Sequence, residues 1–210
     1  MTIFPQLDLS SGGFLIWILV GYGLGSVPFG LILARLMGLG NLRSIGSGNI
    51  GATNVLRTGN KIAAALTLLL DGGKGAIAVL IAQSLSGEIA AQITALAAML
   101  GHCYPVWIKF RGGKGVATFL GVMLALSPLI GVACCATWLL TAILKRISSL
   151  SALLAAAASV LWSIIFAHHS LIGLCLLLCI LIFWRHRANI TRLLDGTEPK
   201  IGSKSSTKPD

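Results

Sequence analysis

The sequence predicts an all-α, polytopic integral membrane protein with seven transmembrane helices, its N-terminus outside and its C-terminus in the cytoplasm. Apolar residues make up 56% of the 210 residues and charged residues only 10%, with a mean hydropathy of +0.90. Soluble domains carry about a quarter charged residues, so this composition favours a bilayer. The net charge of +10 falls between long apolar runs, which is typical of loops beside anionic headgroups and argues against a nucleic acid partner.

The apolar runs fit seven crossings when each crossing takes about 20 apolar residues. The run 116–144 is too long for one crossing, and we expect it to cross twice with a break at Pro128. Pro28 and nearby glycines predict a kink or a close helix contact in the first span. The predicted spans are 14–37, 61–83, 88–107, the two parts of 116–144, 148–167 and 170–184.

The positions of the cations set the orientation. Fifteen of the sixteen lysines and arginines lie in four segments, which are 35–61, 109–114, 145–146 and 185–208. Cytoplasmic loops carry an excess of such residues, and seven crossings place all four segments on that side. No basic n-region of a signal peptide precedes the first run, so we expect a permanent span there. We expect one domain over 1–200 and a disordered cytoplasmic tail over 201–210.

Three polar segments share the predicted cytoplasmic face. The first, 46–57, combines three glycines, two asparagines and two hydroxyls with Arg57; the others are 102–118 and 185–198. A glycine-rich backbone and a fixed cation can converge on an anion. Gly112–Gly115 precedes an apolar run, so its backbone N–H groups can lie at a helix N-terminus. These features predict a phosphate site, with room for an acyl chain between helices.

Other interpretations of these residues remain open at this point. Asp71 and Lys74 stand three residues apart within a predicted span, and this pair is either functional or a packing device. His102 fits an interfacial residue as well as a ligand-binding one. A transporter of an anionic metabolite would show inverted repeats, but the two Gly-Gly-Lys-Gly copies, at 72–75 and 112–115, lie in sequential spans. A purely structural protein leaves the three polar segments unexplained.

Several kinds of catalysis are disfavoured. There are only six acidic residues and no Asp-x-x-Asp pair, and the cysteines lack metal-ligand spacing, so we expect no metal. Neither Gly-Gly-Lys-Gly copy has the spacing of a nucleotide-binding P-loop. No acid follows a histidine within five residues, which argues against a His–carboxylate base. His168 and His169 are expected at the outer interface.

The motifs are similar to those of the bacterial acyl-phosphate:glycerol-3-phosphate acyltransferases. They are Ser47–Arg57, then Gly101-His102 with Phe110–Thr118, then Arg185–Ile190 with Gly196-Thr197-Glu198, and the likeness spans about residues 14–200. The resemblance implies acyl transfer from acyl-phosphate to the 1-hydroxyl of glycerol 3-phosphate, the first step of phospholipid synthesis. It also implies no cofactor and no obligate protein partner. The enzyme would lie in the bacterial inner membrane with its site at the cytoplasmic face.

The resemblance further implies the residues of the site. Five would be catalytic: Ser47, Arg57, Lys114, His186 and Asn189. Those expected to bind substrate are Gly48, Asn49, Gly51, Thr53, Asn54, His102, Gly112, Gly113, Gly115, Ser151 (the weakest match) and Glu198. We expect Gly112–Gly115 to cradle phosphate. His186 and Asn189 would donate hydrogen bonds to a hydroxyl or a phosphate, and Glu198 would be an acid that orients other groups of the site. Arg57 and Lys114 would neutralise the leaving phosphate, which would accept the hydroxyl proton.

Overall fold

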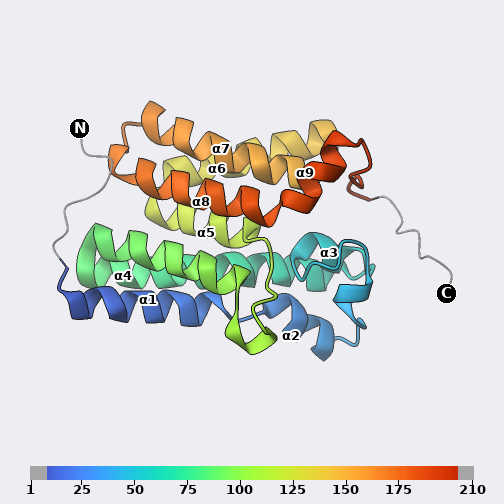
Figure 1. Ribbon diagram of the computed structural model, residues 1–210, viewed down its shortest axis with the longest axis horizontal. Coiled ribbons are helices and arrows are strands. Elements are labelled where there is room, and N and C mark those ends of the chain that lie inside the picture. Colours follow the sequence, from blue (N-terminus) through green and yellow to red (C-terminus); the bar gives the residue numbers. More distant parts are fainter. Residues whose placement is uncertain (1–8, 203–210) are drawn as a thin grey trace.

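The computed structural model describes residues 9–202, and within that range the regular structure is entirely helical (Figure 1). Short 3₁₀ turns cover Leu42–Ser44, Val106–Ile108 and His169–Leu171. The α-helices are α1 (Ser11–Gly25), α2 (Phe29–Leu36), α3 (Ala52–Leu56), α4 (Lys61–Cys103), α5 (Val116–Leu126), α6 (Pro128–Lys145), α7 (Ser148–Ile165), α8 (Ile172–Arg185) and α9 (Arg187–Leu194).

The first predicted span is broken into α1 and α2 at Ser26–Pro28, as the proline predicted. Proline has no backbone N–H, so a helix that meets it leaves carbonyl groups without their usual partners. Beside the break, the carbonyl of Val27 accepts hydrogen bonds from Phe29 N at 3.1 Å and from Lys74 Nζ at 2.7 Å. The break in one span is therefore stabilised by a cation from another.

The helix α4 is a hairpin that contains two predicted spans. Its 43 residues are interrupted at Gly87, whose φ of 78° lies in the left-handed region that glycine adopts without strain. The two halves lie side by side (Figure 1), and Lys74 Nζ in one half is 3.0 Å from His102 Nδ1 in the other. The turn predicted near residues 84–87 is therefore confirmed.

The long run 116–144 is divided into α5 and α6 at the predicted break. Pro128 occupies the first turn of α6, where its missing N–H costs little, and the Ser127 hydroxyl accepts from Ile130 N at 3.5 Å. α5 has only 11 residues, which is about 16 Å at 1.5 Å per residue. That is about half the ~30 Å of a bilayer core.

Four segments of the described chain are long and apolar enough to cross a membrane. A fifth is added if α8 and α9, which meet at a sharp bend, are counted together as one span. One of the four, Lys61–Ile108, is the hairpin of α4 with its extension. Large apolar side chains such as Leu69 and Leu140 are exposed on the outside of the bundle. Seven crossings and the placement of the termini stay predictions. Most of the tail predicted over 201–210 lies outside the described residues.

The short helix α5 lies at the centre of the bundle. α4 packs against one side of it with α1 beyond α4, and α6 packs against the other side, where α7 and α8 also lie (Figure 1). Phe119 and Met123 of α5 are fully buried against Val79 of α4, and Ile182 of α8 joins the same core. The small residues of Gly72–Gly75 let α5 cross α4 closely. In this copy, Gly72 and Gly75 serve helix packing.

Candidate active site

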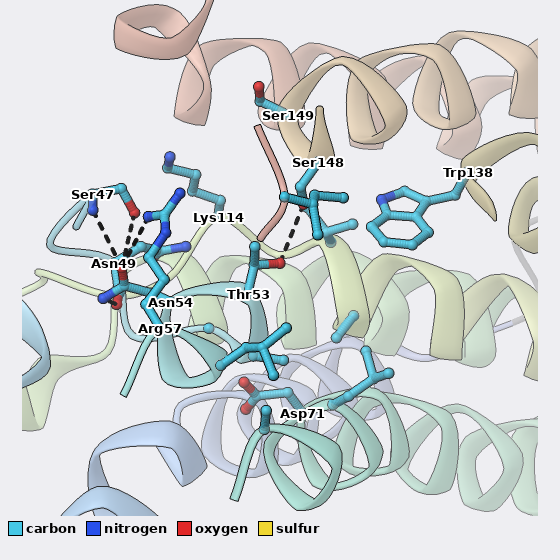
Figure 2. Close-up of a pocket in the computed structure, with 18 of the residues that line it drawn as sticks. Ser47, Asn49, Thr53, Asn54, Arg57, Asp71, Lys114, Trp138, Ser148 and Ser149 are labelled. Carbon is cyan, nitrogen blue, oxygen red and sulfur yellow. Dashed lines mark hydrogen bonds between the residues drawn. The ribbon is translucent and has the colours of Figure 1, made fainter. Parts of the chain in front are cut away.

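A cavity of about 740 Å³ opens where the polar segments meet (Figure 2). Twelve of the sixteen residues predicted for the site line it, including all five predicted to be catalytic. They are Ser47, Asn49, Gly51, Thr53, Asn54, Arg57, His102, Lys114, Gly115, His186, Asn189 and Glu198. Gly48, Gly112, Gly113 and Ser151 do not line it. The roles of the twelve stay proposals.

Asn54 holds the first polar segment in shape. Its side chain is buried and its Oδ1 accepts from Ser47 N at 3.2 Å and from Arg57 Nη1 at 3.2 Å (Figure 2). Its Nδ2 donates to the carbonyls of Leu42, at 2.8 Å, and Asn49, at 2.7 Å. One buried amide thus ties the serine and the arginine to the loop that carries them.

A second chain of hydrogen bonds positions Lys114. Its Nζ donates to Asn189 Oδ1 at 2.5 Å, and Asn189 Nδ2 donates to Glu198 Oε1 at 2.5 Å. Ser149 Oγ donates to the same Glu198 oxygen at 2.7 Å, and Arg192 Nε to the other at 2.7 Å. Glu198 therefore holds both the asparagine that contacts Lys114 and a serine of α7, which fits the orienting role expected of it.

Lys114 and Glu198 lie in loops outside the apolar helices and have shifted pKa values. Burial lowers the pKa of Lys114 to about 8; Glu198 opposes the shift, and Arg192, Arg185 and Arg57 add to it. Partial burial acts to raise the pKa of Glu198, but hydrogen bonds from Ser149, Asn189 and Arg192 hold it below its usual value. Lys114 is mostly protonated at neutral pH and Glu198 is ionised.

His186 lies at a bend of 66° between α8 and α9. α8 ends at Arg185 and α9 begins at Arg187, and the bend between them brings both His186 and Asn189 to the cavity. His186 Nδ1 is 2.8 Å from the carbonyl oxygen of Ile182. A carbonyl only accepts, so Nδ1 carries the proton and Nε2 is an acceptor while the ring is neutral. Burial lowers the pKa of His186 to about 4. Its free nitrogen is thus an acceptor, not the expected donor.

The prediction that Gly112 and Gly113 cradle phosphate is wrong. Their N–H groups donate to the carbonyls of Cys103, at 3.2 Å, and His102, at 3.0 Å. Their own carbonyls accept from Arg185, whose Nε is 3.1 Å from Gly113 O and whose Nη2 is 3.2 Å from Gly112 O. These glycines hold the loop to the end of α4, and only Gly115 of the four-residue element, besides Lys114, reaches the cavity.

Two other predicted contacts also fail. Ser151 is buried in α7, does not line the cavity and donates to the carbonyl of Ile147 at 2.9 Å. Ser148 and Ser149 line the cavity in its place, and Ser148 Oγ is 3.2 Å from Thr53 Oγ1 (Figure 2). Gly48 shapes the loop with a φ of 66°. The cluster of serines after Lys145 was visible in the sequence, but not which of them faces inward.

The cavity continues along an apolar wall that no sequence motif marked. Leu68 of α4, Leu120 of α5 and Trp138 and Leu139 of α6 line it. In Figure 2 the Trp138 ring lies on the far side of Thr53 from Arg57 and Lys114. Apolar residues of this kind are abundant in every span, so composition cannot single out the ones that face a cavity. One cavity thus joins a cationic end to an apolar wall.

The fold is that of a helical membrane protein, and the cavity has the cationic end and apolar wall that suit an anionic, amphiphilic ligand. The family model described as glycerol-3-phosphate acyltransferase matches residues 15–196. A glycerol-3-phosphate acyltransferase of Ruegeria pomeroyi is 61% identical over 202 residues, covering 96% of this chain and all of the relative. One of Roseobacter denitrificans is 62% identical over 189 residues, covering 90% and 94%. The chain therefore belongs to the glycerol-3-phosphate acyltransferase family.

Solved structures agree with this assignment. The chain is similar to PlsY (YgiH), an integral membrane glycerol 3-phosphate acyltransferase, in its glycerol 3-phosphate form, with a TM-score of 0.85 and 40% identity over 90% of this chain and 96% of that one. The lysophosphatidic acid form gives a TM-score of 0.82 and 38% identity, covering 90% of this chain and 95% of that one. The predicted family and the membrane-embedded helical fold are both confirmed.

Proposed function

We propose that this protein transfers an acyl group from acyl-phosphate to the 1-hydroxyl of glycerol 3-phosphate, giving 1-acyl-glycerol 3-phosphate and inorganic phosphate. The observation that carries the proposal is the two-part cavity, with Arg57 and Lys114 at one end and Leu120 and Trp138 on its wall. An acyl-phosphate has this same division into an anionic head and an apolar chain. The related PlsY structures, named for glycerol 3-phosphate and lysophosphatidic acid forms, support the acceptor and the product.

Positive charge at the head of the cavity acts on the leaving group. When the hydroxyl oxygen attacks the acyl carbon, a C–O bond forms and the bond from the acyl carbon to the phosphate oxygen breaks, so negative charge grows on phosphate. Arg57 is held by Asn54 and Lys114 by Asn189. Cations fixed before the reaction stabilise developing charge without a cost of reorganisation during the step.

The hydroxyl proton goes to the leaving phosphate. His186 Nε2 is an acceptor at the cavity wall, and it orients glycerol 3-phosphate by accepting a hydrogen bond from the hydroxyl at carbon 2, which leaves the proton of the attacking 1-hydroxyl free to pass to the leaving phosphate. With its pKa lowered to about 4, the ring is a weak base and does not retain the proton. Acyl-phosphate is a mixed anhydride and already activated, so position and charge supply most of the rate.

The proposal includes no metal and no cofactor. Among residues 9–202, no three His, Cys, Asp or Glu side chains come together in a geometry that holds a metal. We place the site at the cytoplasmic face of the bacterial inner membrane, with seven crossings, because the basic segments 35–61, 109–114, 145–146 and 185–208 would then share that face. The purified protein is expected to act without a protein partner.

A comparison of acyl donors tests the proposal. Purified protein in detergent receives labelled glycerol 3-phosphate with acyl-phosphate, acyl-CoA or acyl-carrier protein of the same chain length, with and without a metal chelator. We expect lysophosphatidic acid from acyl-phosphate alone, and no effect of the chelator. Equal product from acyl-CoA would overturn the assignment of the donor, and loss of product with the chelator would overturn the metal-free mechanism.

A further inference from the structure

A buried polar cluster lies beside the cavity, and the proposed reaction does not use it. Lys74 Nζ donates to Asp71 Oδ1 at 2.8 Å and to the carbonyl of Val27 at 2.7 Å. Its third neighbour is His102 Nδ1, at 3.0 Å. All three residues of the α4 hairpin are at most 7% exposed. The ion pair expected from the i, i+3 spacing is confirmed.

The hydrogens of Lys74 determine which nitrogen of His102 carries a proton. An ammonium has three N–H donors and no acceptor. Two of them go to oxygens, and the third meets His102 Nδ1. Nδ1 must then accept, which leaves the proton of the neutral imidazole on Nε2. Asp71 Oδ1 is 3.8 Å from Nδ1, too far for a hydrogen bond that would reverse this assignment.

The opposite edge of the ring faces the loop that carries Lys114. A Cβ built on Gly113 would overlap His102 Nε2, so only glycine allows the ring to lie there. Gly113 N donates to His102 O at 3.0 Å, which fixes the loop against the same residue. His102 and Asp71 both line the cavity, and Asp71 lies across it from Ser148 and Ser149 in Figure 2.

We propose that Lys74, held by Asp71, is a positioning residue that keeps His102, which lines the cavity beside the loop of Lys114, as an Nε2–H donor to a substrate phosphate. The two residues do not touch substrate and act through the imidazole. This inference rests on the proposed function, because it takes a substrate phosphate to be the group that accepts the hydrogen bond from His102 Nε2. A buried charged pair can be costly, and this arrangement gives the pair a reason beyond helix packing.

The first test reads the tautomer of His102 directly and needs no substrate. Nitrogen NMR of the detergent-solubilised protein, with isotope-labelled histidine, is assigned by the signal lost in His102→Gln. We expect a protonated Nε2 and an unprotonated Nδ1 in the wild type. In Asp71→Leu/Lys74→Met, which replaces the pair with apolar side chains, the signal should become a mixture of the two tautomers. A proton on Nδ1 in the wild type, or no change in the double variant, would overturn the proposal.

The second test is a double-mutant cycle on activity. His102→Asn keeps an acceptor near Lys74 but removes the donor to the cavity, whereas His102→Gln keeps a donor at that distance. We expect His102→Asn to lower kcat/KM about 10- to 100-fold, the range for a charge-assisted hydrogen bond, and His102→Gln to lower it far less. The Asp71→Leu/Lys74→Met change should lower kcat/KM about 2-fold, because an even mixture of the two tautomers halves the competent fraction.

The cycle separates positioning from packing. If the pair acts through His102, Asp71→Leu/Lys74→Met should have no further effect in the His102→Asn background, because coupled residues are not additive. Independent losses that multiply would overturn the proposal and assign the pair to packing. If acyl-phosphate is not the acyl donor, the comparison of acyl donors with wild-type protein would show it. The tautomer of His102 would be unaffected by that result.

Discussion

The buried amide of Asn54 offers the sharpest test of how the site is built. Asn54 is 2% exposed and makes hydrogen bonds on both sides of its amide. In Asn54→Ala, the carbonyls of Leu42 and Asn49 lose their donor, and Arg57 and Ser47 lose their acceptor. The substitution therefore removes support for a cation of the site without touching the cation itself.

The expected cost follows from these contacts. Leaving one buried acceptor unsatisfied costs about 1–3 kcal/mol, so two stranded carbonyls give about 2–6 kcal/mol. A stability of about 5–15 kcal/mol survives a loss at the middle of that range, so we expect a folded but less stable protein. Misplacing the Arg57 guanidinium by about 1 Å should lower kcat roughly 10²-fold.

The assay compares Asn54→Ala with Asn60→Ala in the same detergent, by thermal unfolding and by turnover. Asn60 caps α4 by accepting from Ala63 N at 2.9 Å and does not line the cavity. Its loss should cost about 1 kcal/mol of stability with kcat near wild type. A folded Asn54→Ala enzyme that keeps kcat within about threefold of the wild type would refute the proposed support of Arg57 and Ser47.

Three further outcomes are expected. Because the pKa of Lys114 is lowered to about 8, the side chain loses its charge above that pH, and kcat/KM should fall on the alkaline side with an apparent pKa near 8. Lys114→Arg, which stays charged, should lack that alkaline limb. The same limb in both enzymes would exclude Lys114 as the group that titrates. His186→Gln, which can place an oxygen near the lost Nε2, should retain far more activity than His186→Ala. The pH–rate profile of the wild type should show no limb near pH 6.5. If folded His186→Gln and His186→Ala enzymes are equally inactive, the acceptor role of His186 is rejected. In a background without native cysteines, a cysteine at position 86 should react with an impermeant reagent from outside and one at 146 should not, and outside labelling at 146 would exclude seven crossings.

The breaks in the helices could be predicted because they depend on local backbone chemistry. Pro28, Gly87 and Pro128 each end or turn a helix in the structure at or next to the predicted point. Proline cannot continue a helix and glycine alone turns freely, so these signals need no knowledge of the neighbours. The order of the polar motifs likewise identified the family and twelve of the residues that line the cavity.

What the sequence could not provide depends on contacts between distant segments. Gly112 and Gly113 turn their N–H groups to the end of α4 instead of to a ligand. Ser151 differs from Ser148 only by less than a turn of α7, yet one is buried and the other lines the cavity. The acceptor role of His186 is set by the carbonyl of Ile182 and by a bend of 66°. No local pattern encodes these orientations.

Phosphate release measured together with acyl transfer tests the central claim most directly. The claim is that Arg57 and Lys114 stabilise a phosphate that leaves as the acyl group moves to glycerol 3-phosphate. The wild type should release one phosphate for each lysophosphatidic acid formed, and Arg57→Ala and Lys114→Ala should each lower kcat roughly 10²-fold. Arg35→Ala and Lys145→Ala, which remove exposed cations outside the cavity, should turn over normally. Product formed without phosphate release, or normal kcat in folded Arg57→Ala and Lys114→Ala enzymes, would contradict the account.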